Sequence, residues 1–341
     1  MDKTFIGIVI AAAFVLIGFQ HFRQQAAGRE YSQTRSAAAP SAESSSSGTC
    51  STANLRLRWP MRGEPGKDWV VANYTDHDKG KNSMRDYRGR TGTDAVTYDG
   101  HKGLDIEIAN FRAMDSGIPV FAALDGVVED VFDSSPDRNL HCSSDKWNFV
   151  LLQHAGGWKT IYGHLKRDSA KVRPGERVST GTFLGYVGSS GCSTYPHLHF
   201  EVQDCQGRSL DPVKEGLFLD APDDVMSWRP KLMDLSLFQP AIHSILPIQD
   251  PGTSDRNLIS ARYEFSVGVT ISVLKPGDVL TMEFFSPITG SNDVFFERTI
   301  TQFLPRSHWW GNYRFDAEGI WTLTVRVNGQ VLYQRPVTAT L

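Results

Sequence analysis

Short alternating runs of β-forming residues, broken by Gly, Pro, Asp and Asn, fill residues 55–213 and set the strongest limit on the fold. Examples are PVFAALDGVVEDVF (119–132), WNFVLLQH (147–154) and TFLGYVG (182–188). No long segment has the 3.6-residue period of an amphipathic helix. The region is therefore predicted to be mostly β, as a domain spanning residues 51–217.

A second β-rich region follows a Pro-containing connector at residues 218–245. At its end, Trp321, Leu323 and Val325 alternate with polar residues, and Asn328-Gly329 supplies a two-residue hairpin turn. Regularly spaced strands over about 100 residues are typical of an immunoglobulin-like β-sandwich. We therefore expect a β-sandwich accessory domain at residues 246–341, and an all-β fold for both domains.

The N-terminal region is different in kind. Residues 4–19, TFIGIVIAAAFVLIGF, carry no charge and follow Lys3. This length lies between that of a membrane span and that of the apolar core of a signal peptide. Two interpretations stay open for residues 1–23, an uncleaved membrane anchor or a cleaved signal segment, and both export the rest of the chain. Residues 24–50 are rich in Ser and Ala and are predicted to form a disordered linker.

Charge and cysteine content narrow the partners and the compartment. The net charge is −3 and no long basic run occurs, which argues against nucleic acid as a partner. An exported chain would hold its cysteines outside the cytoplasm, where disulfides form. Two disulfides are therefore expected, with all three pairings open; the cysteines are Cys50, Cys142, Cys192 and Cys205.

Two histidines one residue apart, in TYPHLHFEV (194–202), are the most informative polar feature. Alternate residues of a strand point to the same side, so His197 and His199 would share one space. A buried pair of imidazoles is costly unless each ring has a partner. The sequence therefore predicts that other polar groups reach this space.

HKGLD supplies such groups, because it places His101 and Asp105 four residues apart. On a strand the two would share a face, with Gly103 between them leaving room. His101, Asp105 and one histidine of the H-x-H pair would give three N and O donors. A catalytic zinc site has three protein ligands of this kind and one position open to water. The remaining imidazoles would be available for proton transfer.

Several spaced motifs, in this order, together resemble the lysostaphin-type (LytM-like) zinc endopeptidases, which cut peptidoglycan peptides. They cover about residues 100–213 and are HKGLD, GIPVFAALDGVV, NFVLLQH, TIYGHL, RPGERVSTGTFLGYVGSSG and PHLHFEV. The resemblance implies an antiparallel β domain of the barrel-sandwich-hybrid type. It also implies that His101, Asp105 and His199 bind one Zn²⁺ ion per chain, and that His164 and His197 form the catalytic pair. Which of these two histidines takes the proton from water stays open.

Roles can also be predicted for three further residues of the motifs. Glu201 shares a strand face with His199, where it could orient a metal ligand or form a structural ion pair. His154 is interpreted as structural, and Asn148 as a partner of backbone groups near the cleft. The insertion at residues 133–147 is longer than a hairpin needs and is expected to shape the substrate groove.

The resulting hypothesis is an exported zinc-dependent endopeptidase that hydrolyses peptide bonds in peptidoglycan. Its location would be periplasmic and inner-membrane-anchored through the N-terminal segment, or secreted if that segment is cleaved. Two alternatives stay open: a non-catalytic regulator that activates other peptidoglycan hydrolases, and a peptidase that acts on proteins. The C-terminal domain is expected to bind substrate or a protein partner.

Overall fold

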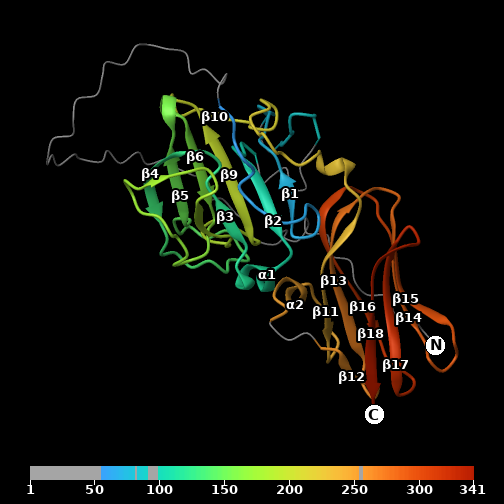
Figure 1. Cartoon of the computed structure of the whole chain (residues 1–341). Coiled ribbons are helices and arrows are strands. Elements are labelled where there is room, and N and C mark those ends of the chain that lie inside the picture. Colours follow the sequence, from blue (N-terminus) through green and yellow to red (C-terminus); the bar gives the residue numbers. More distant parts are fainter. Residues whose placement is uncertain (1–54, 81–82, 91–98, 253–255) are drawn as a thin grey trace, which may run out of the picture.

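The structure is a computed structural model that describes residues 55–80, 83–90, 99–252 and 256–341 (Figure 1). Strands dominate both halves of this part of the chain, as predicted. In the described ranges no helix has the length and apolar character needed to cross a membrane. The apolar segment at residues 4–19 and the linker after it lie outside these ranges.

An eight-stranded antiparallel sheet forms the body of the first β region, residues 55–217. Its strand order is β1-β2-β9-β6-β5-β4-β7, and β10 pairs with β9. A second, two-stranded sheet is formed by β3 and β8. The strands of the large sheet are β1 (Trp69–Asn73), β2 (Leu104–Ile108), β4 (Gly126–Phe132), β5 (Phe149–Gln153), β6 (Lys159–Gly163), β7 (Arg177–Val178), β9 (His197–Gln203) and β10 (Ser209–Leu210). The other elements are β3 (Pro119–Phe121), β8 (Phe183–Tyr186), helix α1 (Phe111–Ser116) and a 3-10 turn (Ala155–Gly157).

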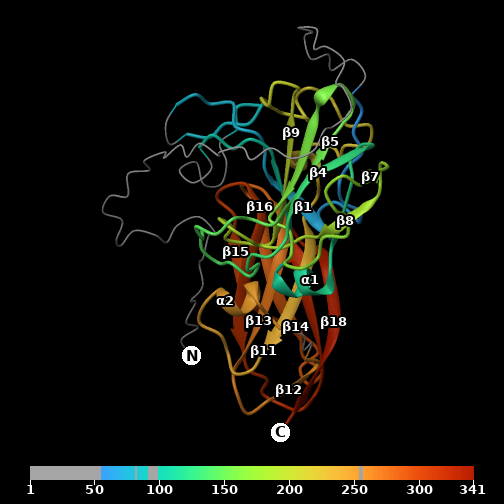
Figure 2. The same cartoon turned by 90° about the vertical axis from the view of Figure 1, so that its left-hand side faces the viewer.

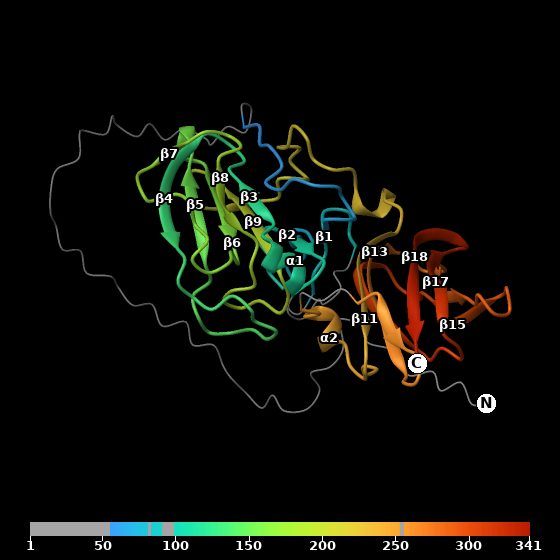
Figure 3. The same ribbon diagram turned by 60° about the horizontal axis from the view of Figure 1, so that its bottom comes forward.

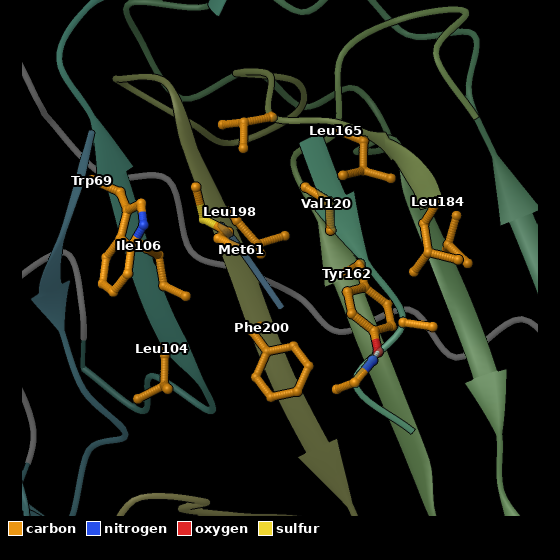
Figure 4. Packing of buried hydrophobic residues seen from close by; sticks show 14 of the residues in the cluster. Met61, Trp69, Leu104, Ile106, Val120, Tyr162, Leu165, Leu184, Leu198 and Phe200 are labelled. Atoms are coloured by element: carbon orange, nitrogen blue, oxygen red, sulfur yellow. Dashed lines mark hydrogen bonds between the residues drawn. The ribbon is translucent and has the colours of Figure 1, made fainter. Parts of the chain in front are cut away.

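One face of the large sheet forms the hydrophobic core of this region. On β9 the side chains of Leu198 and Phe200 are fully buried, and they pack beside Ile106 of β2 and Tyr162 of β6 (Figure 4). The small sheet covers this face, with Leu184 of β8 in the same cluster. Because side chains alternate along a strand, the residues between these apolar ones point to the opposite face. That face carries the histidines of β9.

Two further sheets make up the C-terminal region, residues 231–341. The first has the order β11-β13-β16, and the second has the order β12-β18-β17-β14-β15. Their apolar side chains share one cluster, so the two sheets enclose a common core. The strands are β11 (Lys231–Phe238), β12 (Leu258–Ser260), β13 (Phe265–Leu274), β14 (Val279–Phe285), β15 (Asn292–Thr299), β16 (Leu304–Tyr313), β17 (Gly319–Val327) and β18 (Gln330–Thr340). Helix α2 (Leu246–Gln249) and a 3-10 turn (Val225–Ser227) lie near the junction with the first region.

Two sequence predictions concern this C-terminal region. The hairpin turn is confirmed, because Asn328 and Gly329 join β17 to β18 and have φ values of 53° and 76°. Positive φ at both central residues is what a type I′ turn requires. Within the segment predicted as a connector, residues 218–245, the chain forms β11, which pairs with β13. The immunoglobulin-like topology stays a prediction.

The two β regions lie against each other along β1 and β16 (Figure 2). Helix α1 of the first region reaches the junction (Figure 3). There Arg112 bonds Asp234 of β11. A second ion pair, between Arg306 of β16 and Glu107 of β2, crosses the same junction with an N–O distance of 2.6 Å. The C-terminal region is therefore joined directly to the strands next to the histidines of β9.

Candidate metal centre

A row of directly opposed residues crosses four strands on the polar face of the large sheet. Asn73 of β1 pairs with Asp105 of β2, Asp105 pairs with His199 of β9, and His199 pairs with Gly163 of β6. Directly opposed residues on antiparallel strands have Cβ atoms about 4.5–5.5 Å apart. The strand register itself therefore brings Asp105 and His199 together, although 94 residues separate them in the chain.

Three donor atoms meet at one point of this row. Asp105 Oδ1 lies 3.0 Å from His101 Nε2 and 3.0 Å from His199 Nδ1, and the two nitrogens are 3.1 Å apart. All three side chains are nearly buried, with 3–9% of each exposed. His101 was expected on a strand with Asp105, but it precedes β2 in a loop. Its ring reaches the cluster because Nδ1 lies 2.8 Å from the carbonyl oxygen of Tyr74.

Each of these two histidines has a polar partner on the far side of its ring. The Tyr74 carbonyl can only accept, so His101 Nδ1 donates to it and Nε2 carries the lone pair in the neutral ring. His199 Nε2 lies at an ion-pair distance of 3.7 Å from Glu201 Oε2, while its Nδ1 lies 3.0 Å from Asp105 Oδ1. Two imidazole nitrogens therefore share one carboxylate oxygen, an arrangement that positive charge, from a proton or a metal ion, stabilises.

The spacing of the donors fits a zinc ion. Tetrahedral Zn²⁺ with N and O ligands at about 2.0–2.1 Å places those ligands about 3.3 Å apart. The three observed separations are 3.0, 3.0 and 3.1 Å. Gly103 permits this closeness, because a Cβ there would lie 3.0 Å from His199 Nε2 and 2.4 Å from the Phe200 carbonyl oxygen. The donor set and its cradle therefore fit the metal that the sequence predicted.

The electrostatics of the three side chains also favour a cation. Burial opposes ionisation of Asp105, but the electrostatic interaction with His101 and His197 and the hydrogen bonds from the rings of His101 and His199 hold the pKa of its carboxyl well below the usual range. Burial also opposes protonation of His199, but the hydrogen bonds to Asp105 and Glu201 raise the pKa of its ring to about 9. The site thus holds a carboxylate and attracts positive charge, which a proton supplies when no metal is bound.

His164 and His197 lie beside the donor set, with ring centroids 4.5 Å apart. His164 Nδ1 lies 2.7 Å from the Ser190 carbonyl oxygen, and His197 Nδ1 lies 2.7 Å from the Tyr195 carbonyl oxygen. Each ring must donate from Nδ1, which leaves Nε2 as the nitrogen that can exchange a proton with a ligand. Burial and the neighbouring charges of His197 and His199 hold the pKa of His164 well below its ordinary value.

The backbone at His164 is unusual, because its φ of 57° lies in the left-handed region that residues other than glycine rarely adopt. His164 follows the last residue of β6, so this conformation turns the chain sharply at the edge of the site. A non-glycine residue keeps such backbone angles only where the surrounding structure holds it in place. Asn148 provides part of that hold: it donates to the Leu165 carbonyl oxygen and bonds both backbone groups of Ser135.

Trp147 is a site residue that the sequence did not single out. Its ring centroid lies 4.9 Å from that of His164 and 5.4 Å from that of His199. Gly163 makes room for it, because a Cβ at Gly163 would lie 2.3 Å from the indole ring. Trp147 ends the insertion at residues 133–147, whose length was the signal that this segment reaches the site.

A disulfide braces the same insertion. Cys142 is bonded to Cys192, which lies five residues before His197. Cys205 is disulfide-bonded as well, and Cys50 lies outside the described residues. The bridge ties the insertion that carries Trp147 to the loop that leads into β9. The two segments next to the site are thereby linked covalently.

His154 and Glu201, the two remaining polar residues of the motifs, are not among the three proposed metal donors. His154 is buried away from the donor set, between the Asp125 carbonyl oxygen and Thr160 Oγ1, each at 2.8 Å. Glu201 accepts from Gln203 Nε2 at 2.9 Å and from Ser209 Oγ at 2.5 Å, while its other oxygen faces His199. Glu201 therefore combines the two roles considered for it, an ion pair and a support for the His199 ring.

Comparison with known proteins assigns this part of the chain. Residues 99–212 match the family model for Peptidase family M23. A DD-carboxypeptidase/endopeptidase Mpg from Neisseria meningitidis is 35% identical over 117 residues, which cover 34% of this chain and 23% of that protein. The peptidoglycan DD-endopeptidase ShyA from Vibrio cholerae is 33% identical over 117 residues, with the same coverage of 34% and 23%. The chain thus spans about a fifth of the length of the curated relatives that it matches.

Solved structures give a looser likeness. The catalytic domain of the prophage-encoded M23 protein EnpA from Enterococcus faecalis, as an A109H mutant, is 25% identical. The match covers 45% of this chain and 94% of that one, with a TM-score of 0.31. At this score we base no conclusion on the superposition, and the assignment depends on the family model and the sequence relatives.

Proposed function

Because residues 99–212 form a domain of Peptidase family M23, we propose that this chain is a zinc-dependent endopeptidase that hydrolyses peptide bonds in peptidoglycan. The observation that carries the proposal is the meeting of His101 Nε2, Asp105 Oδ1 and His199 Nδ1 within 3.1 Å of one another. The substrate class is supported by the relatives named as peptidoglycan or DD-endopeptidases.

His101, Asp105 and His199 would hold the zinc ion through these atoms. When bound, zinc would act as a Lewis acid that polarises a peptide carbonyl and lowers the pKa of a water molecule. Asn73 supports Asp105, because its Nδ2 donates to Asp105 Oδ2 at 3.2 Å. Glu201 supports His199 from the far side of its ring. Such supporting contacts fix the orientation of metal ligands.

His164 and His197 would move the protons of the reaction. Each is tied through Nδ1 to a backbone carbonyl oxygen, so Nε2 is the reacting atom in both. One Nε2 accepts the proton of the attacking water, and the other, in its protonated form, donates a hydrogen bond to the oxyanion of the tetrahedral intermediate. The proton then passes to the leaving amine. Trp147, packed on His164, would limit the access of bulk water to this pair.

We also propose that the catalytic domain works outside the cytoplasm. The uncharged segment at residues 4–19 supports export, and the Cys142–Cys192 disulfide fits an oxidising compartment. The location would be the periplasm, with the N-terminal segment as an inner-membrane anchor or as a signal that is removed. Fractionation of expressing cells, with the mass of the mature protein, separates these two outcomes from a cytoplasmic one.

The decisive experiment incubates the purified full chain, loaded with zinc, with peptidoglycan sacculi and identifies the released muropeptides by mass spectrometry. The proposal expects new peptide ends in the products and no cleavage by a His199→Ala variant. Intact sacculi beside a zinc-loaded protein would overturn it. Casein and the separately purified hydrolases of the host cell serve as parallel substrates and partners, so that a protein peptidase or a non-catalytic activator would be recognised.

A further inference from the structure

The position of His197 depends on the backbone of Tyr195, two residues before it. The Tyr195 carbonyl oxygen accepts from His197 Nδ1 at 2.7 Å and from Ser193 Oγ at 2.9 Å. The first of these bonds sets both the tautomer and the rotation of the imidazole ring. Any shift of Tyr195 would therefore move His197 Nε2, the atom that is proposed to exchange protons.

The side chain of Tyr195 is held from the C-terminal region. The guanidinium carbon of Arg306, on β16, lies 3.4 Å from the centroid of the Tyr195 ring, which is cation–π contact. On the other side of the junction, the Tyr195 hydroxyl donates to the carbonyl oxygen of Ala109. The ring is thus fixed between an arginine of one region and a backbone group of the other.

Arg306 also forms an ion pair with β2, the strand that pairs with β9 at His197. Its Nε donates to Glu107 Oε2 at 2.6 Å, and Glu107 of β2 is the direct cross-strand partner of His197 on β9. The side chain of Arg306 is 5% exposed and that of Glu107 is 13% exposed. A buried guanidinium needs a charged partner, so the pair cannot separate without a large penalty. Arg306 therefore contacts Tyr195, whose carbonyl oxygen binds the His197 ring, and Glu107, which lies opposite His197 on the next strand.

We propose that Arg306 is a positioning residue for His197, acting through Tyr195 and Glu107. The C-terminal region would then be part of the catalytic apparatus rather than only a binding module. This inference rests on the proposed function, because His197 must be one of the two proton-transfer groups. We expect the metal donors to be unaffected, since Arg306 acts on Glu107, His308 and Tyr195.

The test compares Arg306→Gln and Arg306→Lys in the full chain with a matched control, Arg112→Gln. Arg112 is also an arginine at the junction, but its partners are Asp234, Leu235 and Ser236 of β11. Displacement of a reacting group by about 1 Å can cost about 100-fold in rate. We therefore expect Arg306→Gln to lower kcat by about 100-fold with KM and zinc content unchanged, and Arg306→Lys to recover part of the loss.

A measurement without substrate keeps the inference separate from the proposed function. In protein labelled with ¹⁵N-histidine, the Nδ1 proton of His197 should give a protected resonance in the zinc-loaded wild type. The resonance should broaden or shift in Arg306→Gln and stay in place in Arg112→Gln. Even if Arg306→Gln fails to fold, Arg306→Lys should show a smaller shift of the same resonance.

The outcomes divide cleanly. An active wild type whose Arg306→Gln variant keeps both its kcat and the His197 resonance would overturn the inference and leave the proposed function intact. An equal loss of kcat in Arg112→Gln would also overturn it, because a general loosening of the junction would then explain the effect. A wild type that cleaves nothing would contradict the proposed function, while the resonance would still report whether Arg306 positions His197.

Discussion

Two central strands of the molecule bury polar side chains in different ways. On β9, His197, His199 and Glu201 are all buried on one face. On β13, in the C-terminal region, every residue is buried, and Ser266, Thr270 and Ser272 line one face. Each strand therefore buries three polar side chains on one face. The two sets differ in how their hydrogen-bond donors and acceptors are paired.

The hydroxyl groups of β13 form closed pairs. Ser266 Oγ donates to Asn312 Oδ1 at 2.6 Å and accepts from the backbone nitrogen of Ile242 at 2.9 Å, so each donor meets an acceptor. Around β9, by contrast, His199 Nδ1 and His101 Nε2 both lie 3.0 Å from the same oxygen, Asp105 Oδ1, and 3.1 Å from each other. Buried polar groups with one partner each are structural, whereas one carboxylate oxygen shared by two imidazole nitrogens is the arrangement that we propose as a metal site.

The largest expected effect tests the division of roles on β9 itself. His199→Ala should lose both zinc and activity, because it removes one of the three metal donors. His197→Ala should keep one zinc per chain while kcat falls by about 100- to 10,000-fold, the usual contribution of a proton-transfer group. Metal analysis and turnover on purified muropeptides measure the two properties separately. Loss of zinc from His197→Ala would show that the roles of the two histidines are wrongly divided.

A smaller effect is expected from the support of the metal ligand. Glu201→Gln keeps the size of the side chain but removes the negative charge that faces His199 Nε2 at 3.7 Å. Changes in groups that orient metal ligands typically weaken metal binding by about 10- to 100-fold. Competition with a chelator of known affinity measures this change. Unaltered zinc affinity would mean that Glu201 serves only its bonds to Gln203 and Ser209.

The matched change on β13 should affect stability alone. Ser266→Ala leaves Asn312 Oδ1 and the Ile242 backbone nitrogen without their buried partner. We expect the free energy of unfolding to fall by about 1–3 kcal/mol, with zinc content and kcat as in the wild type. Chemical denaturation gives the first quantity. A drop in kcat for the folded variant would contradict the claim that the polar residues of β13 serve stability alone.

His154, a buried histidine outside the proposed metal site, should affect how stability depends on pH. Burial lowers the pKa of His154 below its ordinary value of 6.5, so the folded chain resists a proton that the unfolded chain accepts. Its contribution to stability is therefore complete above about pH 6.5 and decreases as the pH falls below that value. Between pH 7.5 and 5.5, chemical denaturation should therefore show a smaller loss of unfolding free energy for His154→Gln than for the wild type. Equal losses in the two proteins would place the pH sensitivity elsewhere.

The sequence predicted which residues of the site lie together better than it predicted their local geometry. Asp105 and His199 are found on neighbouring strands because the alternation of HLHFEV and LDIEI leaves only one face for the polar residues. His101 was expected to continue β2, but the strand begins at Leu104 and the ring arrives from a loop. A motif of five residues cannot show whether the chain is extended at its first position, because the Tyr74 carbonyl that holds the ring lies 27 residues earlier.

Long-range contacts explain what the sequence could not indicate. Trp147 is next to the site because Gly163 admits its ring and the Cys142–Cys192 bridge holds the insertion, and neither relation has a local signature. Arg306 contacts Glu107 across 199 residues. Periodicity shows that β16 is a strand, but only the packing of the two β regions decides which of its residues meets β2.

The most direct test of the central claim is the location of zinc in crystals of the full chain, from anomalous scattering measured at the zinc absorption edge. The account predicts a single peak per chain between His101 Nε2, Asp105 Oδ1 and His199 Nδ1, and no peak at this position in His199→Ala. A zinc-exposed protein with no peak there, or with its peak at other residues, would contradict the account.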